Sequence, residues 1–329
     1  MKIFYTLLTA FCLFAFQSNV FSATRTVSNK SGDVAQFTSL QEAITASADG
    51  DIILISGSPT SYGNVTMAKR LTLIGPGSNL DFNGGHNATI GTMTFSSAQT
   101  SKSVLQGLKI GTITITAAEC DEVQVKRCEV AYIVNQTSNF TRIPQKWILE
   151  ESVIYSSGIA NRPNNTNLSA NWSIRNCYLY STVALNGSIF ENNVWVFSGH
   201  SGNGNIYNNN IYFSSSFSQV TGGSFANNIF DNAPTIDFNA NSSSGNFFST
   251  DPQVVSFRAD FFPGDFSLKP GSPGINAGTD GRDIGMFGGR GFLITMIPGI
   301  PSVQSFIILN PSVPQNGTLN IKVEGKANN

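Results

Sequence analysis

The chain has 329 residues, a formal net charge of −1 and only 12% charged residues. Nucleic acids and anionic membrane surfaces are bound by clustered lysine and arginine, which this composition does not supply, so neither is expected as a partner. The only two histidines, His86 and His200, lie far apart in sequence, so no metal site is expected. No cofactor is expected on the same grounds.

Residues 1–22 have the pattern of a secretory signal peptide. Lys2 supplies the positive end, an apolar run follows from Phe4 to Phe16, and a small-residue cleavage pattern ends at Ser22. The apolar run is too short for a membrane span. The pattern predicts a soluble exported protein that is secreted or held at the cell surface, with the periplasm as the alternative.

Residues 24–50 are predicted to form an N-terminal cap. Leu40 and Ile44 share one face of a short helix, for which Ser39 is the expected N-cap, and the strand Ile52–Ile55 follows. A helix here would cover the open edge of the first strand layer, which would otherwise invite aggregation.

A repeat of 20 residues follows the cap. Thr72, Thr92 and Thr112 are spaced by 20 and 20 residues, which predicts equivalent positions on successive coils. The step then lengthens to 24 and 25 residues, and the extra residues are expected in loops at 135–146 and 157–169. The whole chain would hold about ten coils in a stack of ~50 Å.

From residue 171 to 248 the repeat becomes rich in asparagine, and the last Asn before each apolar step recurs at spacings of 17, 17, 18 and 18 residues. A propeller blade needs about 40 residues, so the period favours a β-solenoid. Asparagine tolerates the left-handed bend, and stacked amides can donate and accept along a ladder. A sugar-binding groove is the alternative interpretation. The predicted structural ladder is Asn176, Asn193, Asn210, Asn228 and Asn246.

Three cysteines lie beyond the predicted signal peptide: Cys120, Cys128 and Cys177. Cys128 and Cys177 follow equivalent bends two coils apart, a separation of about 9.6 Å that exceeds the ~7 Å limit for a disulfide. They are expected to pack inward as small apolar side chains.

The C-terminal part contains two strands bounded by prolines, Val303–Leu309 and Thr318–Val323. They are expected to fold back as a hairpin over the last coil. The predicted division is a signal peptide at 1–22, a β-helix with its cap at 23–290 and a β-rich extension at 291–329.

Two patterns carry a family resemblance. The N-terminal one combines residues 40–44, 50–55 and 71–75, and the closing one combines residues 251–252, 266–273, 276–278 and 283–285. Together they resemble secreted bacterial right-handed parallel β-helix proteins of the pectin-lyase-like superfamily. The resemblance implies an all-β, single right-handed parallel β-helix with a helical cap. Members include lyases, hydrolases, esterases, adhesins and phage spikes, so the fold does not fix an activity.

The polygalacturonase-like motifs of that superfamily are not matched. The chain has no Asp-Asp pair, and Gly199-His200-Ser201 departs from the expected Gly-His-Gly. A lyase instead needs a base and a cation, with Ca²⁺ possible, to handle the charge next to a uronate carboxylate. The candidate catalytic residues are Lys126, Arg175, Glu150 and Glu151, which the repeat places near one another. The alternative is a salt-bridge ladder on an outward edge.

Several aromatic side chains could stack on sugars, although their alternation with polar residues favours a core position. They are Trp195, Tyr207, Tyr212, Phe213, Phe217 and Phe230. The leading functional hypothesis is a non-catalytic polysaccharide-binding or structural solenoid. A lyase for an acidic glycan and a surface adhesin are the two alternatives, and the sequence leaves the oligomeric state open.

Overall fold

A computed structural model describes residues 22–137, 142–161, 168–180, 182–257, 265–300, 302–310 and 312–326. Of the predicted signal peptide, only Ser22 is within these residues, so that prediction is not tested. Parts of both predicted long loops also lie outside them. Within the described part of the first loop region, β9 ends at Asn135. In the second, β11 continues to Asn161 and covers the first five residues of the predicted loop.

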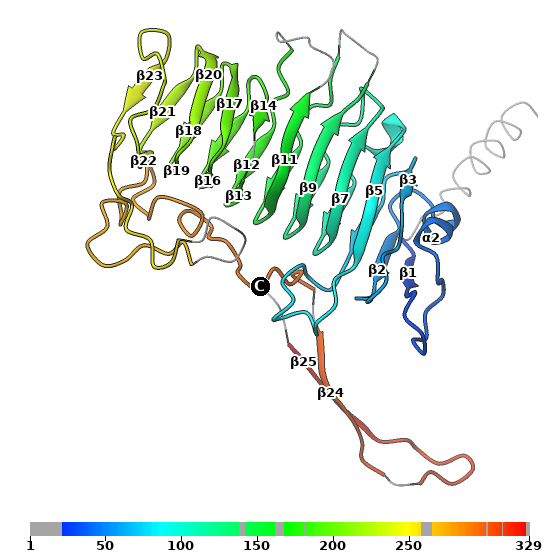
Figure 1. Cartoon of the computed structure of the whole chain (residues 1–329). Helices are drawn as coiled ribbons and strands as arrows, with labels where there is room; N and C mark the ends of the chain where they lie inside the picture. Colours follow the sequence, from blue (N-terminus) through cyan, green and yellow to red (C-terminus); the bar gives the residue numbers. More distant parts are fainter. Residues whose placement is uncertain are drawn as a thin grey trace, which may run out of the picture.

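The described chain is a parallel β-solenoid, as the sequence predicted, and it has about nine turns where about ten were expected. Most turns contribute one strand to each of two parallel sheets (Figure 1). The first sheet has 11 strands: β1 Thr24–Val27, β2 Ile52–Ile55, β4 Thr72–Ile74, β6 Val104–Gln106, β8 Gln124–Lys126, β10 Ile148–Glu150, β12 Ser173–Arg175, β15 Ile189–Glu191, β18 Ile206–Asn208, β21 Ser224–Ala226 and β23 Ser242–Ser244.

The second sheet has 12 strands. Nine form its main path: β3 Val65–Met67, β5 Thr89–Phe95, β7 Lys109–Ile115, β9 Glu129–Asn135, β11 Val153–Asn161, β13 Tyr178–Leu179, β16 Val194–Val196, β19 Ile211–Phe213 and β22 Ile229–Phe230. The strands β14 Val183–Ala184, β17 Gly199–Asn203 and β20 Ser216–Thr221 extend it from β11. Thr92 and Thr112 are register partners in the second sheet, as predicted. The predicted place of Thr72 in the same column was wrong, because Thr72 lies in the first sheet.

The core fills the inside of the coils because inward positions repeat in register. Leu149, Ile174 and Phe190 are consecutive partners in the first sheet, and all three are buried. Strand spacing in a sheet is about 4.8 Å, which suits ring stacking. Tyr207 accordingly stacks on Phe190 at 5.0 Å and on Phe225 at 4.5 Å. The aromatic side chains named as possible sugar contacts are all buried. Five lie in the core inside the coils, as predicted, and Phe213 lies in a second cluster on the outer face of the second sheet.

The N-terminal cap is the helix α2, Leu40–Ala46, and the side chain of Ser39 accepts a hydrogen bond from the Glu42 N–H as its N-cap. Leu40, Ala43 and Ile44 are buried against the first coils. One 3₁₀ turn, Ala98–Thr100, lies between β5 and β6. The three cysteines are buried and free, and burial raises the pKa of each thiol to about 12.

Asparagines at one bend form a buried ladder. The Oδ1 of Asn210 accepts from both the backbone N–H and the side-chain amide of Asn193, each at 3.0 Å. Asn228 does the same for Asn210, and Asn246 for Asn228. Each amide also donates to a carbonyl of the preceding coil, as Asn210 does to Phe190 at 2.9 Å. The ladder therefore satisfies backbone groups that the bend would leave unpaired.

Asn176 is not part of this ladder, contrary to the prediction. It stands one position earlier, in the left-handed column that continues through Asn192, Asn209 and Asn227, with φ values of 49°, 53°, 57° and 53°. The ladder position of its coil is Cys177, whose N–H donates to Asn193. Sequence alone did not separate the two columns, because Asn occupies both.

A C-terminal strap, residues 265–298, runs back along the outer face of the second sheet (Figure 1). Ile284 and Met286 pack there with Val194 and Ile211 in a second hydrophobic cluster. The strap reaches the N-terminal coils, where Pro298 lies beside Gly107. It therefore joins coils that are far apart in the stack.

After the strap, β24 (Ser302–Ile308) and β25 (Ile321–Lys326) pair antiparallel, which confirms the predicted hairpin. The predicted position over the last coil was wrong. Because the strap returns along the stack, the hairpin begins beside the N-terminal coils and projects away from them (Figure 1).

His200 is buried within the aromatic core. Its ring stacks on Phe217 at 4.4 Å, and its Nε2 lies 3.2 Å from the Ser198 hydroxyl. Burial lowers the pKa of His200 from 6.5 to about 3, because the charged imidazolium would lose its hydration. This histidine is therefore a neutral core residue.

We expect Asn210→Ala to lower the free energy of unfolding by about 3 kcal/mol, because it leaves buried ladder groups without partners. Urea denaturation measures this. Asn208→Ala, on the outward face of the same coil, is the matched control and should change stability by about 0.5 kcal/mol or less. Equal losses in the two variants would contradict the structural role of the ladder.

The pKa of His200 is lower in the folded state than in the unfolded chain. Its contribution to the free energy of unfolding is therefore complete above pH 6.5 and is lost as the pH falls towards 3. Between pH 7 and 4.5 the wild type should lose roughly 2–3 kcal/mol more unfolding free energy than His200→Phe. Urea titrations at both pH values test this. Parallel losses would show that His200 takes up a proton in the folded state.

Candidate functional site: a charged edge and an arginine-lined pocket

Four charged side chains occupy one register position on the outer face of the first sheet. Lys126 pairs with Glu150, Glu150 with Arg175, and Arg175 with Glu191 on the successive strands β8, β10, β12 and β15. This is the register expected from the repeat. We call these four residues the charged edge.

Ion pairs along the charged edge are loose. Lys126 Nζ lies 3.7 Å from Glu150, and Arg175 Nε lies 4.0 Å from Glu191. About a third of the Lys126, Arg175 and Glu191 side chains is exposed. Pairs of this kind contribute roughly 0–1 kcal/mol to stability, so the edge is not needed to hold the coils together.

Glu151 lies beside the charged edge rather than in it. It occupies the left-handed column with φ 48°, and its carboxylate binds Arg127 Nε at 2.7 Å and Lys126 Nζ at 3.3 Å. Arg127 in turn donates to the Ile297 carbonyl of the strap at 2.8 Å. Glu151 is thereby part of an ion-pair network that anchors the strap.

The strap converts one end of the charged edge into a pocket of about 320 Å³. Arg175 and Glu191 line one side, and the strap contributes Asp280, Arg282 and Arg290 to the other. Three guanidinium groups and two carboxylates therefore line this pocket. The volume lies within the range of small-molecule sites, and we call this site the arginine pocket.

Asparagines of the left-handed column hold the strap side of the arginine pocket. The Asn176 amide donates to the carbonyls of Met286 at 2.9 Å and Gly288 at 2.7 Å. Asn192 lies against the same segment, so closely that a Cβ on Gly288 would lie 2.7 Å from the Asn192 Nδ2. Two side chains of the stack thus fix the backbone that carries Arg282 and Arg290.

Sequence reasoning found Arg175 but missed Arg282, Arg290 and Asp280. They are more than 80 residues from Glu191 in sequence, and no repeat position relates them to the coils. The available signal was two arginines around the Gly-rich segment 285–289 in a chain with few charges. Of the four predicted catalytic residues, the pocket contains only Arg175.

A second charge pair lies on the second sheet. Lys109 and Glu129 are register partners on β7 and β9, with Nζ 2.8 Å from the carboxylate. Burial raises the pKa of Glu129, and the neighbouring Lys109 opposes this by favouring the charged form. Because one cation already faces this carboxylate at close range, the pair has the arrangement of a structural ion pair.

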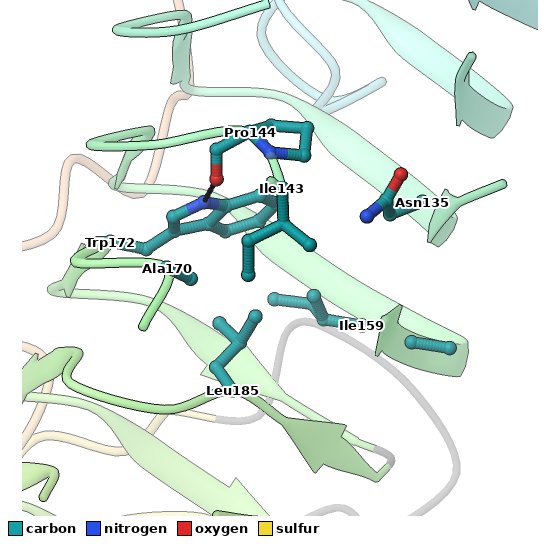
Figure 2. Close-up of a pocket in the computed structure, with 8 residues that line it drawn as sticks. Asn135, Ile143, Pro144, Ile159, Ala170, Trp172 and Leu185 are labelled. Atoms are coloured by element: carbon teal, nitrogen blue, oxygen red, sulfur yellow. Dashed lines mark hydrogen bonds between the residues drawn. The ribbon is translucent and has the colours of Figure 1, made fainter. Parts of the chain in front are cut away.

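A small apolar pocket also occurs next to Trp172, which is one of the residues that line it (Figure 2). Ile143, Ile159 and Leu185 converge on it, and the Trp172 indole donates to the Pro144 carbonyl at 3.0 Å. Its volume of about 10 Å³ is close to that of one water probe, so it is a packing gap rather than a ligand site.

Among the residues described, no group of three or more His, Cys, Asp or Glu side chains is arranged to hold a metal ion. Within the same residues, no helix combines the length and apolar character that a membrane crossing requires. Comparison with models of protein families gives no match, and comparison with curated proteins gives none either. The stacked parallel sheets define the chain as a parallel β-solenoid protein.

We expect Asn176→Asp to release the strap beside the arginine pocket, because a carboxylate cannot donate to the carbonyls of Met286 and Gly288. Losing two buried donors should raise amide exchange of residues 283–291 about tenfold or more. Hydrogen–deuterium exchange measures this, with Asn208→Asp as the control. Unchanged exchange in Asn176→Asp would show that the strap is held by its apolar contacts alone.

Proposed function

We propose that this chain is an exported, non-catalytic solenoid that binds an acidic polysaccharide in the arginine pocket. The observation that carries the proposal is the convergence of Arg175 with Arg282 and Arg290 from a distant part of the chain. Guanidinium groups bind carboxylates through two parallel hydrogen bonds, which suits the uronate groups of acidic glycans. The signal-like N-terminus supports a location at the cell surface or outside the cell.

Ion pairs in the charged edge, and that of Glu151 beside it, support binding rather than catalysis. Glu150, Glu151 and Glu191 each lie within 4.0 Å of a cation. A general base needs a lone pair that is available to the reacting proton. Lys126, the candidate base of a lyase, is already engaged by two carboxylates, those of Glu150 at 3.7 Å and Glu151 at 3.3 Å.

Arg290 gives the clearest variant for testing this function. Arg290→Gln should weaken retention on immobilised polygalacturonate or alginate about tenfold, because one guanidinium contact is lost. Retention by the wild type should fall as salt rises, since exposed charges are screened. Lys102→Gln, on an N-terminal coil outside the pocket, is the matched control. Equal retention by both variants would exclude the arginine pocket as the binding site.

The same incubations separate the alternatives. We expect no growth of the ultraviolet absorbance of unsaturated uronate ends, with or without added Ca²⁺. Absorbance growth that disappears in Lys126→Ala or Arg175→Ala would establish a lyase and overturn the non-catalytic assignment. Neither retention nor cleavage across acidic glycans would favour the surface-adhesin alternative.

A further inference from the structure

A second groove, of about 660 Å³, lies at the opposite ends of the second-sheet strands from the arginine pocket. The arginine pocket contains Asn176 and Asn192, which precede β13 and β16, whereas the second groove contains Phe197 and Phe213, at the ends of β16 and β19. Phe257 also lines this groove. We call this site the aromatic groove.

Phe197 has two features that a purely structural role does not explain. Its φ of 47° is in the left-handed region, which bulky residues rarely adopt and which costs of order 1 kcal/mol. Its side chain is also 51% exposed. On the next coil Ser214 has the same conformation with φ 49°, so this bend does not require an aromatic residue.

The other aromatic side chains at the groove pack against one another. Phe257 is 44% exposed and lies 4.6 Å from the ring of Phe213, which is itself buried in the second hydrophobic cluster. Tyr180 contacts Phe197 edge-to-face at 6.1 Å. The groove therefore presents two exposed rings on a rigid support.

Polar groups at the rim of the groove have the opposite charge balance to the arginine pocket. Asp231 and Asp251 each use Oδ1 to accept a backbone N–H at 2.8 Å, from Ser214 and Gln253 respectively. Within the described residues, the Oδ2 atoms of both have no hydrogen-bond partner and can accept from a ligand. Among the described residues that line the groove, Lys269 is the one cation.

We propose that the aromatic groove binds an uncharged pyranose unit of a polysaccharide. Such a sugar has an apolar C–H face that suits the rings of Phe197 and Phe257, and hydroxyl groups that can donate to Asp231 and Asp251. Among the described lining residues, two carboxylates stand against one ammonium group, which disfavours a uronate here. This site extends the proposed function to a separate surface, and it stands or fails independently of the arginine pocket.

Phe197→Asn is a sharp test, because asparagine tolerates the left-handed conformation better than phenylalanine. The variant should be as stable as the wild type or more so, while its affinity for a neutral glycan falls about tenfold or more. Affinity electrophoresis in gels containing β-glucan, mannan or xylan measures binding, and thermal unfolding measures stability. Phe82→Asn, an equally exposed phenylalanine outside the groove, is the matched control.

The expected result is retention of the wild type and Phe82→Asn by at least one neutral glycan, with Phe197→Asn and Asp231→Asn weakened. Added salt should leave this retention unchanged, and Arg290→Gln should behave as the wild type. No retention of the wild type by any neutral glycan would overturn the proposal. So would equal retention of Phe197→Asn and the wild type.

Polygalacturonate gels separate the two sites. Phe197→Asn should bind polygalacturonate as the wild type does, whereas Arg290→Gln should bind it more weakly. If Phe197→Asn loses acidic and neutral glycans together, the two grooves are not separate sites and the inference is overturned. Loss of acidic binding alone in Arg290→Gln leaves the aromatic groove supported.

Discussion

Parallel stacking in strict register is the constraint on which the rest of this structure depends. Each coil must turn at the same place, and each turn buries backbone groups that water cannot reach. The amides of Asn193, Asn210, Asn228 and Asn246 satisfy those groups coil by coil, with donor–acceptor distances of 2.9–3.0 Å between them. In-register stacking also brings like rings together inside the coils, so one constraint shapes both the ladder and the core.

A left-handed column beside the ladder directs its side chains out of the coil. Asn176, Asn192, Asn209 and Asn227 all bond to the strap, as Asn209 does to Thr279. The strap in turn covers the apolar outer face of the second sheet, where Ile284 and Met286 pack. Residues that make the bend therefore also assemble the surface, and both grooves are formed where the strap meets the stack.

These two grooves differ in the chemistry they offer a ligand. Guanidinium groups dominate the arginine pocket, whereas exposed rings and two carboxylates line the aromatic groove. A heteropolysaccharide combines acidic and neutral sugars in one chain, so a rigid solenoid with both kinds of site could contact such a polymer twice. Two weak sites on a rigid support give a higher overall affinity than either alone.

Sequence by itself determined the coil. The period of about 17–20 residues, the N-cap at Ser39, the inward alternation and the register of Lys126 with Glu150 and Arg175 all follow from local spacing, because neighbouring coils are one period apart. Only the tertiary structure decided what lies outside the coil. Asn176 and Asn193 look alike in sequence, yet a one-residue difference in bend position sends one to the strap and the other to the ladder. The strap follows no repeat, so the place of Arg282 and Arg290 beside Arg175 depends on long-range packing that no spacing encodes.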